Sequence, residues 1–74
     1  MELKEELLED LQELKEEVDA FNEEIDRLSF VAETTNSLKT LEYARDQLIL
    51  LNKAIKNDTK EMKKLLKQLK KYED

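Results

Sequence analysis

Carboxylates are the side chains of this sequence most able to do chemistry, and they crowd its beginning. Eight of them fall within the first seventeen positions: Glu2, Glu5, Glu6, Glu9, Asp10, Glu13, Glu16 and Glu17. Clustered carboxylates can bind a hard metal ion or serve as general acid and base. The chain has no histidine and no cysteine. That composition excludes soft metal sites, the Glu-x-x-His pairs of di-iron bundles and the commonest general base. We therefore predict no catalytic residue, no metal site and no cofactor, and interpret the acidic run as solvated helix surface.

Asp58 is a different kind of carboxylate, because it interrupts a regular apolar pattern. One interpretation is a polar notch in a helix-packing seam, which would fix the register of the helices or admit water. Another is a helix cap, because Asp58-Thr59-Lys60-Glu61 matches a capping box. No second catalytic group stands near it in the sequence, so the pattern does not support a catalytic role.

Two heptad patterns, with apolar residues at alternating steps of four and three, position these side chains. The first comprises Leu7, Leu11, Leu14, Val18, Phe21, Ile25, Leu28 and Ala32. The second comprises Leu41, Ala44, Leu48, Leu51, Ile55, Met62, Leu65, Leu69 and Tyr72. The second pattern is two residues out of phase with the first, a shift that insertions of three or four residues do not produce. We therefore predict that the chain reverses direction between the two patterns.

The predicted fold is all-α: an antiparallel two-helix coiled-coil hairpin that dimerises to a four-helix bundle. We expect a single helical domain over residues 1–74, with helices over about 2–32 and 37–73 and a turn at about 33–36. Glycine and proline are absent, which favours long helices. In the turn, Asn36 can adopt the left-handed conformation that ends a helix, and Asn36 or Ser37 can cap the next one. The alternative is a three-helix bundle with a break near Asp58.

Charge is divided between the two predicted helices. Residues 1–33 carry thirteen acidic and three basic side chains, whereas residues 34–74 carry six acidic and ten basic ones. The hairpin brings the acidic and basic ends together, so we expect lysines of the second helix to neutralise carboxylates of the first. A turn at 33–36 would place Leu28 opposite Leu41, and Leu11 opposite Asp58.

Several apolar residues lie outside the seam, and such residues mark helices with more than one neighbour. Two others, close to the carboxyl end, would overhang the beginning of the first helix. Together they form the predicted interaction surface: Phe30, Val31, Tyr43, Ile49, Leu50, Leu69 and Tyr72. The expected partner is a second copy of the chain or another helical protein, with no small-molecule ligand.

The predicted function is non-enzymatic: a helical protein–protein interaction or assembly module. The alternative is an acidic inhibitor that imitates nucleic acid through the carboxylates of the first helix. The net charge of −6 disfavours a dedicated nucleic-acid binder. The longest apolar run, Leu48–Leu51, is too short for a membrane span, and the beginning of the chain lacks a signal-peptide pattern. We therefore expect a cytoplasmic protein.

Overall fold

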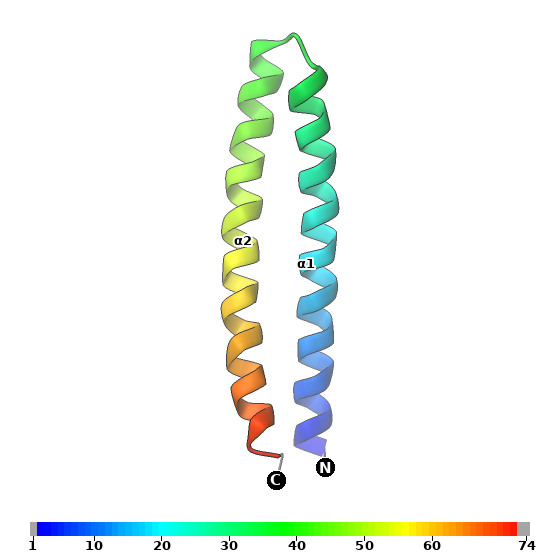
Figure 1. The fold of residues 1–74 in the computed structure, drawn as a ribbon, viewed down its shortest axis with the longest axis vertical. Helices are drawn as coiled ribbons and strands as arrows, with labels where there is room; N and C mark the ends of the chain where they lie inside the picture. The colour runs from blue at the N-terminus through cyan, green and yellow to red at the C-terminus, as the bar shows by residue number, and fades with distance from the viewer. Residues whose placement is uncertain (1, 73–74) are drawn as a thin grey trace.

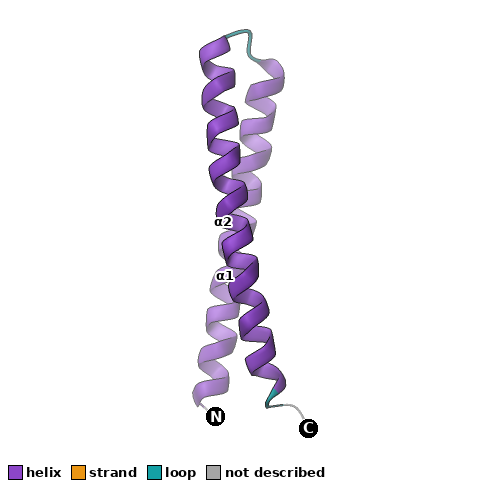
Figure 2. Cartoon of the chain, turned by 90° about the vertical axis from the view of Figure 1, so that its left-hand side faces the viewer, coloured by secondary structure: helices purple, strands orange, loops and turns teal. Residues whose placement is uncertain are grey.

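The computed structural model describes residues 2–72, which form two helices joined by a short loop (Figure 1). Helix α1 spans Glu2–Thr34 and helix α2 spans Leu38–Lys70, each with 33 residues. At about 1.5 Å per residue each helix is about 50 Å long, in line with the longest dimension of 56 Å. The two helices run in opposite directions, so the predicted all-α antiparallel hairpin is confirmed. In side view they cross as they pass each other (Figure 2).

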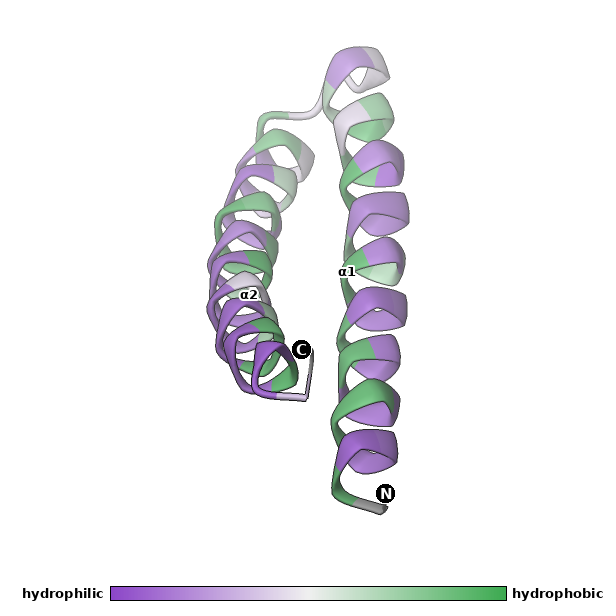
Figure 3. Cartoon of the chain, turned by 60° about the horizontal axis from the view of Figure 1, so that its bottom comes forward, coloured by the Kyte–Doolittle hydropathy of each residue, from purple (hydrophilic) through white to green (hydrophobic). Residues whose placement is uncertain are grey.

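The apolar faces of α1 and α2 turn toward each other, and their polar faces turn outward (Figure 3). Leu7, Leu28 and Ala44 are buried between the helices. Most of the other heptad residues are only half-buried, and Leu41 and Tyr72 are exposed. The heptad pattern therefore identified the packing seam correctly, but two helices alone leave most of that seam open to water.

Helix α2 continues without interruption past Asp58, so the three-helix alternative is wrong. The hydroxyl of Thr59 donates to the backbone carbonyl of Ile55 at 2.8 Å, one helical turn earlier. Asp58 lies in the interior of the helix and does not cap it. The apolar residues before and after Asp58 have the same heptad phase. They therefore face α1 on both sides of Asp58, and their packing stabilises a continuous helix.

The loop occupies residues 35–37, slightly later than the predicted 33–36. Helix α1 runs on to Thr34, whose hydroxyl donates to the carbonyl of Phe30 at 2.9 Å. Ser37 caps α2: its backbone is extended, and its hydroxyl accepts from the backbone N–H of Thr40 at 3.3 Å. No residue in the range 2–72 has a positive φ, so the predicted left-handed conformation of Asn36 is wrong.

The later loop also corrects the predicted register. The residues that lie beside each other across the two helices therefore differ from the predicted pairs. Asp58 lies beside Glu17, not opposite Leu11 as predicted. Because the two helices have equal length, their free ends are level (Figure 1).

The end of α2 also differs from the prediction. The helix ends at Lys70, and the N–H groups of Lys71 and Tyr72 close a final turn on the carbonyls of Gln68 and Leu69. The predicted end at residue 73 lies outside the described residues. Leu69 is half-buried within the seam, so the predicted overhang from this residue onward is wrong.

Candidate interaction surfaces

The apolar residues predicted outside the seam are largely uncovered in the hairpin. We call Phe30, Val31, Tyr43, Ile49 and Leu50 the turn-proximal surface, because all lie in the half nearest the loop. Their exposed fractions are 66% for Phe30, 61% for Tyr43, 57% for Leu50 and 50% for Ile49, whereas Val31 is half-buried. Exposed apolar side chains at this density are typical of a surface that packs against another molecule.

These five residues do not all lie on one side of the hairpin. Tyr43 and Leu50 are seven residues apart and share a helix face. The pKa of Arg27 is raised chiefly by its hydrogen bond to Glu24 and to a smaller degree by Tyr43, so Tyr43 lies near Arg27. Val31 follows Arg27 by one helical turn and therefore lies on the same side. Ile49 is rotated from Leu50 by about 100° around the helix axis. The turn-proximal surface therefore includes residues of both helices and covers more than one side of α2.

Leu38 extends this surface, and the sequence analysis missed it. It is 71% exposed, and it lies about three helical turns before Ile49 on the same face of α2. The available signal was its position: an apolar residue directly after the capping Ser37 and outside both heptad patterns. Of the two predicted residues at the other end of the hairpin, Leu69 is half-buried and Tyr72 is 37% exposed.

The whole chain exposes more surface than a compact protein of its size. Its accessible area is 6166 Å² for a mass of 8.8 kDa. A compact monomer of that mass would expose about 4,800 Å². The excess of about 1,400 Å² exceeds the share of one partner in a standard interface, about 800 Å². An elongated two-helix rod therefore has enough spare surface for a specific interface.

Asp58 is half-buried in the seam, and Glu17 is its neighbour on α1. One carboxylate oxygen of Asp58, Oδ2, is buried without a hydrogen-bond partner. The pKa of Glu17 is raised above its usual 4.5, first because a hydrogen bond to Asp58 favours the protonated form, and also because the two negative charges repel. The pair lies beside a hollow of about 270 Å³ lined by Asp10, Glu13, Leu14, Glu17, Glu61 and Leu65. No group suited to metal binding is found among the described residues.

Ion pairs in the hairpin join neighbours along one helix. Arg27 pairs with Glu24, and this hydrogen bond lowers the pKa of Glu24 and raises that of Arg27. The other pairs are Arg45 with Asp46 and Lys64 with Glu61. Among the side chains of residues 3–72, no ion pair connects α1 to α2. The predicted neutralisation of α1 by lysines of α2 therefore does not occur through direct contacts.

Neither α1 nor α2 contains a stretch both long and apolar enough to cross a membrane. No family model matches the chain, and no curated protein or solved structure was found to match it.

Proposed function

We propose that this chain is a helical interaction module that acts by packing its uncovered faces against another helical surface. The observation that carries this proposal is the incomplete core. Leu7, Leu28 and Ala44 are the buried apolar residues of the described chain, while ten large apolar side chains are exposed. A helix with a wide apolar stripe is stable when it has more than one neighbour.

The turn-proximal surface is the proposed contact, and a second copy of the chain is the simplest partner. Two hairpins packed through this half would form a four-helix bundle, in which each helix gains a second neighbour. Burying two or three of these side chains contributes about 1.5–3 kcal/mol each before the cost of association. Another helical protein with a similar apolar face would satisfy the same requirement.

The test is the molar mass of the purified chain in solution, measured by light scattering over a concentration series. Ile49→Glu combined with Leu50→Glu should shift the mass toward the monomer and weaken thermal stability, while the chain stays helical by circular dichroism. Both side chains are at least half exposed, so the substitutions disturb the surface more than the seam.

A matched control is Leu8→Glu combined with Leu66→Glu. These leucines are 46% and 50% exposed and lie at the other end of the hairpin. The control adds the same charge and removes similar apolar surface, so it should leave the association intact. A wild-type chain that is monomeric at high micromolar concentration and melts cooperatively would contradict self-association. Equal loss of association in the two double variants would contradict the assignment to the turn-proximal surface.

The acidic inhibitor is a second candidate, and one finding favours it. The carboxylates of α1 form no ion pair with lysines of α2 among residues 3–72, so they remain available to a basic partner. An inhibitor of this kind would compete with duplex DNA for a nucleic-acid-binding enzyme, and the competition would weaken with salt. A pulldown against such enzymes at low and high salt distinguishes it from an apolar interaction module, whose contacts persist at high salt.

A further inference from the structure

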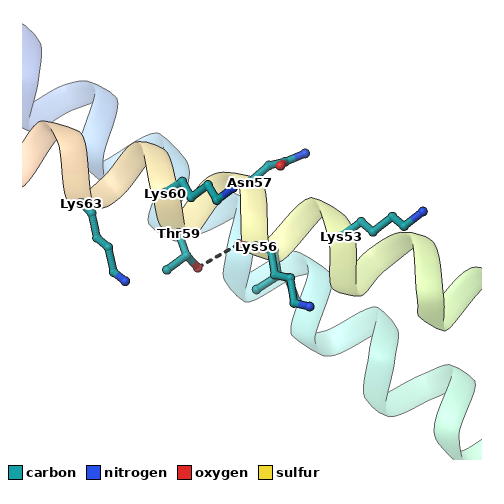
Figure 4. Close-up of a pocket in the computed structure, with 7 residues that line it drawn as sticks. Lys53, Lys56, Asn57, Thr59, Lys60 and Lys63 are labelled. Atoms are coloured by element: carbon teal, nitrogen blue, oxygen red, sulfur yellow. Dashed lines mark hydrogen bonds between the residues drawn. The ribbon is translucent and has the colours of Figure 1, made fainter.

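The outward face of α2 carries a regular row of lysines. They lie at alternating steps of three and four residues, which places them along one side of the helix: Lys53, Lys56, Lys60, Lys63, Lys67 and Lys70. We call this row the lysine face. All six side chains are exposed. Four of them, Lys53, Lys56, Lys60 and Lys63, extend from the helix around a hollow of about 480 Å³ that is also lined by Ile55, Asn57 and Thr59 (Figure 4).

The lysine face has no carboxylate partner within the described part of the chain. Lys64 pairs with Glu61, but it lies outside the row. Six like charges within about 25 Å repel one another, because helix neighbours three and four residues apart lie close together. An acidic surface placed against this face would relieve the repulsion.

The outward face of α1 has the matching pattern. Six positions again alternate by steps of four and three residues, and five of them are acidic while one is a glutamine. They are Glu5, Glu9, Gln12, Glu16, Asp19 and Glu23. We call this row the acidic face. All six are exposed, and they cover about 27 Å, nearly the same length as the lysine face.

The two faces point away from each other. Each helix turns its apolar seam toward the other helix, so their outward faces lie on opposite sides of the hairpin (Figure 3). Both faces also lie mainly in the half of the hairpin that contains the chain ends, because α1 begins where α2 ends (Figure 1). Neighbouring hairpins that point the same way would therefore bring an acidic face level with a lysine face.

We propose that the lysine face binds the acidic face of a second copy of this chain, side by side. Such a contact joins two different surfaces, so each copy keeps one free face of each kind after binding. Contacts of this type continue from copy to copy unless a rotation closes them into a ring. With the two faces on opposite sides of a narrow rod, 16 × 14 Å in cross-section, the expected product is an open row. This contact is separate from the turn-proximal surface and does not depend on it.

A second copy fits the lysine face better than a nucleic acid does. The whole chain carries a net charge of −6. A polyanion that approaches the lysine face is also repelled by the carboxylates of α1. In a row of hairpins, by contrast, every acidic face except the last meets a lysine face. The length and spacing of the two faces supply a register that a DNA backbone does not need.

The experiment measures average molar mass by light scattering at about 20 mM and at about 0.5 M salt, because salt screens exposed charges. At low salt the mass should keep rising with concentration, without a fixed plateau. At high salt it should fall to that of the smallest unit. That unit is a monomer or the apolar dimer of the proposed function. The mass at high salt therefore tests the apolar dimer, and the rise in mass at low salt tests the contact between the lysine and acidic faces. Unchanged mass between the two salt conditions would overturn the inference.

Charge-reversal variants identify the faces. Lys56→Glu with Lys63→Glu should abolish the low-salt rise in mass, and Glu9→Lys with Glu16→Lys should do the same. An equimolar mixture of these two variants should assemble again, because the unchanged acidic face of the first can bind the unchanged lysine face of the second, and the reversed charges restore opposite signs at the other contact. The matched control for the lysine variant, Lys15→Glu with Lys39→Glu, makes the same change in net charge outside both faces and should assemble like the wild type.

Three results would overturn the proposal. The first is equal loss of assembly in the control, which would indicate an effect of net charge alone. The second is failure of the two variants to assemble when mixed, although circular dichroism shows both to be helical. The third is binding of a DNA duplex or of anionic vesicles at low salt without any growth in mass of the protein alone.

Discussion

Replacing Asp58 with leucine is expected to stabilise the hairpin by about 1–2 kcal/mol at neutral pH. The Oδ2 atom of Asp58 is buried without a partner, and a buried unsatisfied polar group costs about 1–3 kcal/mol. The Asp58 side chain is half-buried, so leucine would gain part of the roughly 1.5–3 kcal/mol available from complete burial. We take the lower part of the combined range because water reaches this seam. For a chain of this size the increase corresponds to a rise in Tm of roughly 5–15 °C.

Thermal melts followed by circular dichroism at a fixed protein concentration measure the effect. Leucine also favours helix more than aspartate does, so Asp19→Leu serves as the control. Asp19 is exposed on the outward face of α1, and its substitution should change Tm by only a few degrees. A lower Tm for Asp58→Leu would refute the reasoning, because it would show that Asp58 makes a stabilising contact that the buried Oδ2 atom does not reveal.

Further substitutions and one distance test the same structure. Glu17→Gln should raise Tm near pH 7 but not below about pH 4. The folded-state pKa of Glu17 lies above 4.5, so its stabilising contribution is present at low pH and is lost as the pH rises through that value; melts at both pH values measure this. Ser37→Ala removes the hydroxyl that caps α2 and should destabilise the hairpin by about 1 kcal/mol in the same melts, whereas Ser29→Ala, within α1, should have a smaller effect. Ala44→Leu overfills a fully buried position and should lower stability by about 1–3 kcal/mol. Spin labels at positions 5 and 64 should lie within about 20 Å of each other, as expected for adjacent antiparallel helices, and a separation near 90 Å would contradict the hairpin.

The sequence predicted the hairpin and its seam because both follow from local periodicity. It began the loop too early because Glu33 and Thr34 were placed in the turn. In the structure the hydroxyl of Thr34 bonds to the carbonyl of Phe30, and the N–H of Thr35 bonds to the carbonyl of Val31, which extends α1. Those hydrogen bonds also set the register.

The interaction surface was only partly predictable. Residues outside the seam can be recognised from the heptad phase alone, and four of the five turn-proximal residues are indeed exposed. Their distribution around α2 depends on tertiary packing. The contact between Glu17 and Asp58 was not predictable, because it depends on a register that shifts when the loop moves. Ion pairs between the helices were expected from the total charge of each helix. The total does not show on which face of the helix the charged side chains lie.

The two kinds of uncovered surface are concentrated in different halves of one rod. Six of the ten exposed large apolar side chains lie in the half nearest the loop: Phe30, Leu38, Leu41, Tyr43, Ile49 and Leu50. The lysine and acidic faces lie mainly in the other half. Salt strengthens apolar burial or leaves it unchanged, and it weakens contacts between exposed charges. The order in which assemblies dissociate as salt rises therefore reports which half of the hairpin holds them together. Loss of every assembly at the same salt concentration would contradict this division, because the two halves could not then be acting through separate forces.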